Sequence, residues 1–252
     1  MLQQCKLLKV KECASLFIVI LSISLALPFQ AQTPGASVAQ SSSVNAEDVL
    51  TRFVQAVGGV AVYDDIKSSV IEGNIVDWEG QRIPVERYWK FPDKSLVIEH
   101  RPRKVIRRGC AGNIRWLQEG TGKPKRTKYP YDIENDVGFG EILHWRDRFK
   151  KANFAGEADV LNQRTYVLKV IGSRPATLYF DQQTGLLLRR DTRWEQSSVE
   201  IYYFHYVETS GIKMPWRVEF VYFKTGQKYI SSTIEVRTNT PLEDAMFVMP
   251  EP

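Results

Sequence analysis

The segment ATLYFDQQTGLLLRRD, residues 176–191, predicts a β-hairpin that folds back on itself at Gln182–Gly185. In its first half Ala176, Leu178 and Phe180 alternate with polar neighbours and therefore share one side of a strand. The second half brings three leucines together before it ends in charged residues. The segment thus predicts two antiparallel strands with one apolar face.

The same pattern recurs on both sides of this hairpin, between short turns that contain glycine or proline. Strands joined by such short turns are antiparallel, so the chain is expected to form a meander. Besides the hairpin strands 175–181 and 185–194, strands are expected near 69–78, 82–91, 95–101, 104–110, 113–119, 155–161, 164–172, 198–208, 212–223 and 227–238.

The width of this sheet predicts its curvature. About 11 strands at a spacing of ~4.8 Å give a sheet ~50 Å wide, and two helices, each about 10–12 Å across, cover less than half of it. An uncovered apolar face of that size is unusual in a soluble monomer. We therefore expect an α+β fold: a strongly curved antiparallel β-sheet, an incomplete barrel of about 11 strands, with helices covering the concave face. The enclosed space either holds a ligand or is filled by side chains, and the sequence leaves both open.

Two helices are predicted to accompany the sheet. The first begins at Asn45, a good capping residue with acidic residues in the following turn, and ends at Gly58. Its apolar residues recur at helical spacing. The second, 137–151, lies within a basic insertion at about 122–154.

The beginning of the chain resembles an export signal. Lysines precede an apolar run that ends at Pro28, and the run is short for a membrane span. We expect a signal peptide over residues 1–31, with cleavage as late as 39, and an uncleaved anchor as the alternative. A flexible lead-in, 32–44, and a single domain, 45–252, complete the predicted organisation. The expected location is the periplasm.

Composition argues against several classes of function. The chain of 252 residues is 43% hydrophobic and carries a formal charge of +5, which falls to about +3 without the signal, so neither charge nor export favours a nucleic-acid partner. Only Cys110 lies beyond the signal, and one thiol cannot form an internal disulfide.

Catalytic and metal-binding motifs are not evident. The sequence has no G-x-S-x-G element, and the GTGK segment at 120–123 lacks the other residues of a phosphate-binding loop. His144, with Glu141 and Asp147 at helical spacing, is interpreted as a solvated polar stripe rather than a metal site. The sequence therefore predicts no enzyme, no cofactor and no metal.

Two basic segments, 101–108 and 123–128, carry five and four cationic residues respectively. If they lie side by side, Arg107, Arg108, Lys125 and Arg126 form a surface for a partner protein or for the headgroups of an anionic membrane. The alternative is a solubilising rim.

Large apolar side chains on the strands are the candidates for the wall of a ligand cavity. These wall candidates are Trp89, Trp116, Phe180, Leu188, Tyr203, Trp216 and Phe220, with Phe53 beneath the helix that covers them. Because the parity of one strand relative to another is not fixed by sequence, some of them are expected to point outward.

Four segments resemble a known family. The helix end QAVGG (55–59), the hairpin LYFDQQTGLLLRRD (178–191), the strand–turn–strand VETSGIKMPWRVEF (207–220) and the closing NTPLEDAMFVMP (239–250) are similar to LolA-like proteins, the outer-membrane lipoprotein-sorting superfamily. The resemblance extends from about Asn45 to the end of the chain. It implies a curved antiparallel half-barrel, closed by helices, that shelters acyl chains or another apolar ligand in the periplasm.

The function expected from this resemblance is a non-enzymatic periplasmic carrier or binder of a lipid-like or lipoprotein acyl-chain ligand. A sensor of the same fold, which reads an envelope lipid and contacts a protein partner, is the second hypothesis. A third, an enzyme, would require a cleft that gathers His144, Glu141 and Asp147 around a metal.

Overall fold

The computed structural model describes residues 44–127, 139–194 and 197–251, all of which lie in one compact unit, Ser43–Pro252. The predicted signal peptide and the lead-in up to residue 43 lie outside the described residues.

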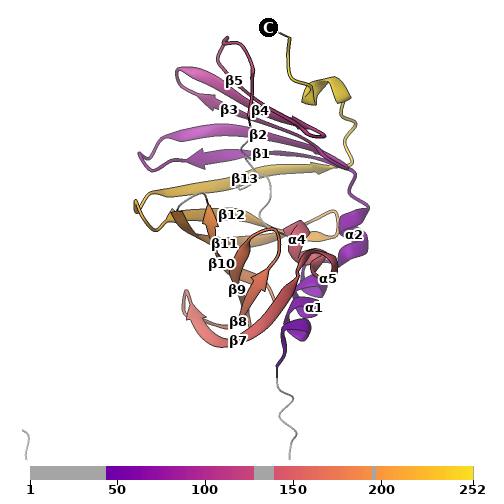
Figure 1. Cartoon of the computed structure of the whole chain (residues 1–252), viewed down its shortest axis with the longest axis vertical. Helices are drawn as coiled ribbons and strands as arrows, with labels where there is room; N and C mark the ends of the chain where they lie inside the picture. The colour runs from indigo at the N-terminus through magenta and orange to yellow at the C-terminus, as the bar shows by residue number, and fades with distance from the viewer. Residues whose placement is uncertain (1–43, 128–138, 195–196, 252) are drawn as a thin grey trace, which may run out of the picture. The chain divides into compact units, whose positions relative to one another are not determined.

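The described residues form 13 strands in one open antiparallel sheet, shown in Figure 1. Its order is β6-β5-β4-β3-β2-β1-β13-β12-β11-β10-β9-β8-β7, so every pair of adjacent strands except β1 and β13 is consecutive in sequence. The strands are β1 Ser68–Val76, β2 Arg82–Lys90, β3 Lys94–Arg101, β4 Lys104–Ala111, β5 Ile114–Glu119, β6 Lys125–Arg126, β7 Lys151–Val160, β8 Gln163–Ile171, β9 Pro175–Asp181, β10 Leu187–Trp194, β11 Ser197–Thr209, β12 Ile212–Tyr222 and β13 Lys228–Thr238.

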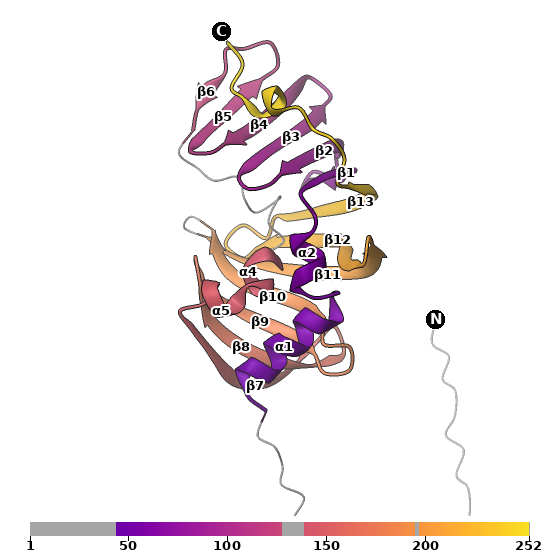
Figure 2. The same ribbon diagram turned by 90° about the vertical axis from the view of Figure 1, so that its right-hand side faces the viewer.

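Short helices flank this sheet. They are α1 Ala46–Ala56, α2 Val60–Asp64, α4 Phe139–Leu143, α5 Trp145–Arg148 and the 3-10 turn η1 Asp244–Phe247. Figure 2 shows α1, α4 and α5 beside the β7–β12 half of the sheet and the C-terminal turn beside the β2–β5 half.

The predicted hairpin is β9 and β10. Its turn forms because the Asp181 carboxylate accepts hydrogen bonds from the backbone N–H groups of Gln183 (3.1 Å) and Thr184 (2.6 Å). Gly185 follows with a φ of 75°, a conformation that glycine adopts without strain. A register shift between Leu187 and Arg189 then places a β-bulge in β10.

Helix α1 begins as predicted. The Asn45 side chain accepts a hydrogen bond of 2.9 Å from the backbone N–H of Asp48, which caps the first turn. Val49, Leu50 and Phe53 on one side of the helix are buried. The predicted cap and the apolar helix face are both confirmed.

The helix expected at 137–151 is shorter and broken. Residues 137 and 138 lie outside the described residues, α4 ends at Leu143, and α5 begins after His144 and ends at Arg148. The helix stops because the chain joins the sheet: the N–H of Lys150 donates to Ile171 (2.7 Å), and β7 starts at Lys151. Pairing with β8 outweighs the helical periodicity there.

The sheet has two faces, which the register lets us follow from end to end. The helix-side face carries Leu178, Ile201, Phe220 and their cross-strand partners, and the outer face carries the residues between them. At the junction of β1 and β13 the register shifts by one residue next to Gly73, where a Cβ would lie 2.2 Å from the backbone oxygen of Ser232. Glycine is therefore required for the two strands to approach.

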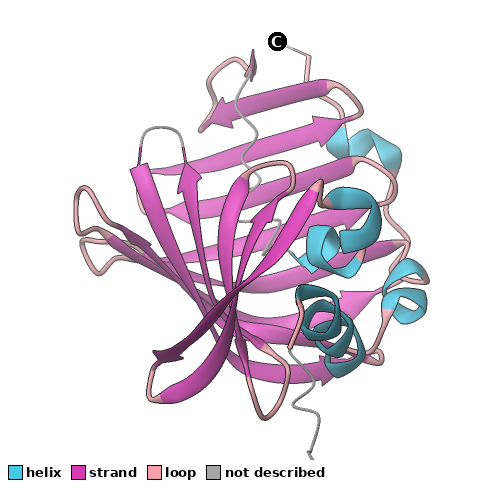
Figure 3. Ribbon diagram, turned by 60° about the horizontal axis from the view of Figure 1, so that its bottom comes forward, coloured by secondary structure: helices cyan, strands magenta, loops and turns pink. Residues whose placement is uncertain are grey.

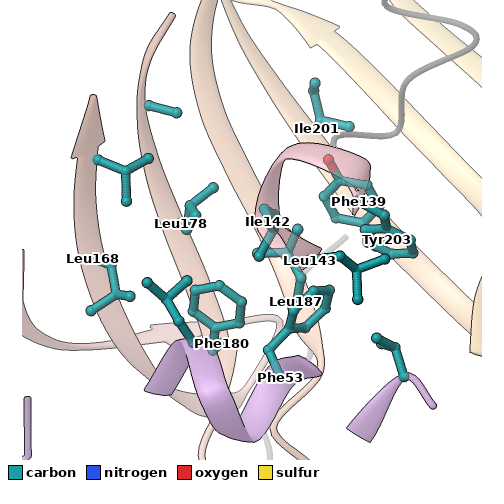
Figure 4. Packing of buried hydrophobic residues seen from close by; sticks show 14 of the residues in the cluster. Phe53, Phe139, Ile142, Leu143, Leu168, Leu178, Phe180, Leu187, Ile201 and Tyr203 are labelled. Carbon is teal, nitrogen blue, oxygen red and sulfur yellow. The ribbon is translucent and has the colours of Figure 1, made fainter. Parts of the chain in front are cut away.

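Figure 3 shows the strands, in magenta, curving beside the helices, in cyan. The main cluster of buried side chains lies on the helix-side face of the β7–β12 half (Figure 4). Helices α1 and α4 contribute side chains that meet those of the strands. Its members are Val49, Leu50, Phe53, Val57, Phe139, Ile142, Leu143, Leu168, Val170, Ala176, Leu178, Phe180, Leu187, Val199, Ile201, Tyr203, Ile212, Val218 and Phe220.

Two smaller clusters occupy opposite faces of the β1–β5 half. The apolar strip, formed by Ile75, Ile83, Val85 and Val97, lies on the helix-side face. The C-terminal cluster, formed by Leu96, Trp116 and Phe247, lies on the outer face, where η1 covers β3 and β4.

Candidate ligand-binding face

Four wall candidates meet inside the main cluster. Phe53, Phe180, Tyr203 and Phe220 are each at most 5% exposed. The ring centroid of Phe53 lies 5.4 Å from that of Phe180 and 5.5 Å from that of Phe139 (Figure 4). Under α1 and α4 the interior is therefore packed with side chains, which was one of the two expected outcomes.

Two further wall candidates lie on the helix-side face outside this cluster. Trp89 shares its side of β2 with Ile83 and Val85, and Trp216 shares its side of β12 with Val218. Both indoles are partly exposed. The Nε1 atom of Trp216 is buried but has no hydrogen-bond acceptor among the described residues, so this N–H is available to a bound polar group.

The two remaining wall candidates do not join them. Trp116 points to the outer face, where it is 2% exposed and donates a hydrogen bond of 2.9 Å to the backbone oxygen of Phe247. Leu188 occupies the β-bulge of β10 and is buried outside the main cluster. Trp116 thus packs under the C-terminal turn, on the face opposite that of Trp89 and Trp216.

The apolar strip extends the helix-side face beyond the main cluster. Tyr229 packs against both sets of side chains and connects them. Ile75, Ile83 and Val85 are at most 5% exposed, although none of the described helices contributes a residue to this cluster. These residues were not among the wall candidates, but the alternation within β2 would have identified Ile83 and Val85.

Charged side chains border the strip on the same face. Glu99 is 1% exposed and accepts hydrogen bonds from Arg101 (2.8 Å) and Arg108. Arg87, which is 7% exposed, donates to the hydroxyl of Ser231 at 3.0 Å. A buried carboxylate with two guanidinium partners is compensated within the protein, so this border is polar without an excess of negative charge.

A backbone kink directs one more aromatic ring inward. His205 has a φ of 52°, and the side chain of the next residue, Tyr206, packs against the main cluster while His205 is exposed. The Tyr206 hydroxyl donates to the backbone oxygen of Leu187 at 2.8 Å, and burial raises its pKa well above the ordinary value. Tyr206 is therefore a neutral donor, and His205 is a solvent-facing residue rather than part of a wall.

The four predicted surface cations are near one another in the sheet but are divided between its faces. Strands β4, β5 and β6 are adjacent, as expected. Alternation and register place Arg108 and Lys125 on the helix-side face and Arg107 and Arg126 on the outer face. The structure therefore does not bring all four to one surface.

The polar residues of the predicted second helix also separate. Glu141 accepts from the Ser173 N–H (2.6 Å) and from Arg190 (3.2 Å), whereas His144 pairs with Asp64 at 3.0 Å. Across the described residues, no group of three or more histidine, cysteine, aspartate or glutamate side chains is placed to hold a metal ion. None of the described helices is both long enough and apolar enough to cross a membrane.

Solved structures resemble this arrangement over most of the chain. A DUF1329 family protein from Desulfovibrio piger has a TM-score of 0.56 at 16% identity, over 80% of this chain and 95% of that one. A LolA superfamily protein from Nitrosomonas europaea has a TM-score of 0.54 at 13% identity, over 82% and 98%. The fold is LolA-like. A putative outer membrane lipoprotein-sorting protein domain from Vibrio parahaemolyticus also matches, with a TM-score of 0.53 at 15% identity over 75% and 95%.

These matches confirm the predicted resemblance to the LolA-like superfamily at the level of the fold. No family model matches the sequence. No curated protein matches it either.

Proposed function

We propose that this protein is a non-enzymatic periplasmic carrier or binder of a lipid-like or lipoprotein acyl-chain ligand, exported by its N-terminal signal. In this proposal the helix-side face is the concave face of a half-barrel, and the helices close one end of it. The LolA-like fold supports the proposal at the level of the protein class.

One observation carries the proposal: the apolar surface of the helix-side face continues past the helices. The apolar strip meets the main cluster at Tyr229, and its described members come from strands alone. Ile83, Val85 and Val97 are at most 2% exposed, so an acyl chain would first have to displace the groups that cover them. It would then bury its methylenes against branched apolar side chains, at ~0.8 kcal/mol for each methylene removed from water.

Trp216 gives the proposed site a polar contact. Its buried indole N–H, which has no acceptor among the described residues, lies on the same face as the strip. An ester or carboxyl oxygen of a bound lipid would satisfy this donor, and a satisfied buried donor is worth about 1 kcal/mol. The ligand would thereby be positioned as well as buried.

The test is to bind a fluorescent fatty acid to the mature protein and to a matched pair of variants. Val97 and Ile98 are neighbours in β3 on opposite faces of the sheet. We expect Val97→Trp, which fills the strip, to weaken binding at least ~10-fold, and Ile98→Trp to leave it unchanged. Thermal unfolding of both variants checks that each is folded.

Trp216→Phe is the milder variant if Val97→Trp fails to fold, and it should weaken binding without a change in volume at the strip. Lipid recovered by native mass spectrometry from the purified protein would support the proposal. A protein that is reproducibly empty and ignores fatty acids, or equal losses in Val97→Trp and Ile98→Trp, would contradict it.

A further inference from the structure

A groove lies on the face of the sheet opposite the main cluster. It has a volume of about 530 Å³ at the end of strands β7 to β11, a volume typical of small-molecule sites. Most of its lining residues come from two cross-strand rows of the outer face. One row contains Asn153, Lys169, Thr177, Asp191 and Glu200, and the other contains Lys151, Ile171, Pro175, Arg193, Ser198 and Phe223.

The groove carries uncompensated positive charge. Lys151, Lys169 and Arg193 are exposed, and none of them forms an ion pair with another described residue. Three cations that face one concavity favour an anion, because they repel one another when the site is empty. The net charge of the groove also depends on how far the charges of its two carboxylates, Asp191 and Glu200, are offset by other cations.

Both carboxylates of the groove are already occupied. Arg189 donates to Asp191 at 2.5 and 2.9 Å and to Glu200 at 2.6 Å. Tyr179 and Tyr202 donate to the same two carboxylates at 2.9 and 2.8 Å, and burial together with the bond to Glu200 raises the pKa of Tyr202 to about 12. Arg189 offsets one of the two carboxylate charges, so the four cations and two carboxylates leave the groove with a net charge of about +2.

One wall of the groove is apolar and open to solvent. Phe223 is 78% exposed, and Ile171 is 44% exposed. Pro175 lies next to Ile171 across the β8–β9 pair. Together these side chains give the groove an apolar edge that the apolar part of an amphiphile could cover.

We propose that this groove is a second binding site, for an anionic amphiphile: the phosphate or carboxylate contacts Lys169 and Arg193, with Lys151 beside them, and the apolar part covers Phe223 and Ile171. This site is separate from the one in the proposed function. It lies on the other face of the sheet and does not depend on ligand binding at the apolar strip.

The experiment measures the binding of three probes by calorimetry in the Val97→Trp background, where the proposed site on the helix-side face is filled. Dodecyl phosphate combines both chemical features, dodecyl maltoside has the chain with a neutral headgroup, and inorganic phosphate has the anion alone. Dodecanoate in a fourth arm distinguishes a carboxylate from a phosphate. We expect binding of dodecyl phosphate or dodecanoate at least ~10-fold tighter than that of the other two probes.

Variants locate the binding. Lys169→Gln combined with Arg193→Gln should weaken binding of the anionic amphiphile at least ~10-fold. Phe223→Ser should weaken its binding several-fold and leave the binding of inorganic phosphate unchanged. The matched controls are Lys213→Gln, an exposed cation at the opposite end of the strands, and Phe91→Ser, a ring that is 57% exposed there. Both should bind like the parent protein.

Equal binding of dodecyl maltoside, or tight binding of inorganic phosphate alone, would overturn the proposal. So would groove variants that bind as tightly as the controls. Weaker fatty-acid binding at the helix-side face in Val97→Trp, together with groove binding that depends on Lys169 and Arg193, would support both sites. Binding at the groove without any binding at the helix-side face would contradict only the proposed carrier function.

Discussion

At the scale of single residues, alternation decides which side chains can act together. Arg107 and Arg108 are consecutive in β4, and a strand must direct them to opposite faces. The sequence alone could have shown that these two do not share a surface. It could not have placed Trp116, because the Phe247 that covers it is 131 residues away in the chain.

Gly109 and Trp116 provide a residue-scale prediction. They are cross-strand partners, and a Cβ on Gly109 would lie 2.2 Å from the indole ring, so the ring occupies the space above the glycine. Gly109→Ala should lower the free energy of unfolding by about 1–3 kcal/mol, measured by urea unfolding. In a Trp116→Leu background the same substitution should cost much less, and equal costs in the two backgrounds would contradict this packing.

At the scale of elements, the helix α1 and the hairpin β9–β10 were predictable because their signals are local. Asn45 caps the helix, and Asp181 with Gly185 forms the turn. The extent of the helix expected at 137–151 was not predictable, because its last residue belongs to β7, which pairs with β8. Strand pairing of this kind is a tertiary contact that helical periodicity does not contain.

The packing of α1 on the sheet predicts a large effect at one position. Phe53 is fully buried between Phe139 and Phe180. Phe53→Ala should destabilise the protein by about 3–5 kcal/mol, because the cavity left among these rings cannot close. Gln55→Ala on the exposed side of the same helix should change stability by less than about 0.5 kcal/mol. Urea unfolding of the two variants checks both expectations.

The C-terminal turn predicts a dependence on pH. The hydrogen bonds from Lys90 and then Lys94 lower the pKa of Asp244 from its ordinary 3.8 to about 2. A lowered pKa contributes stability above the ordinary value, and this contribution is lost as the pH falls from about 4 to about 2. Asp244→Asn should therefore lower the unfolding midpoint more at pH 5 than at pH 2, where the carboxyl group is already about half protonated in the folded protein, and an equal difference at both would contradict the pairing.

At the scale of the whole unit, the open antiparallel sheet and its LolA-like fold could be expected from the meander of short turns and the motifs of the sequence. Which residues share each face of the sheet could not be predicted from the sequence. Two shifts, the bulge in β10 and the register change beside Gly73, change which residues share a face, and neither has a signal in alternation alone. The change beside Gly73 is why the faces of β1–β5, with Trp116 on one and the apolar strip on the other, could be related to the main cluster only through the structure.

The most direct test of the central claim uses a diazirine-bearing fatty acid, cross-linked to the mature protein and mapped residue by residue by mass spectrometry. We expect labels on the helix-side face, at Val85, Val97 and Trp216, and the yield of labelling there should decrease when unlabelled fatty acid is added as a competitor. Labels confined to the outer face, or no labels that compete, would contradict the claim that this face of the sheet holds an acyl chain.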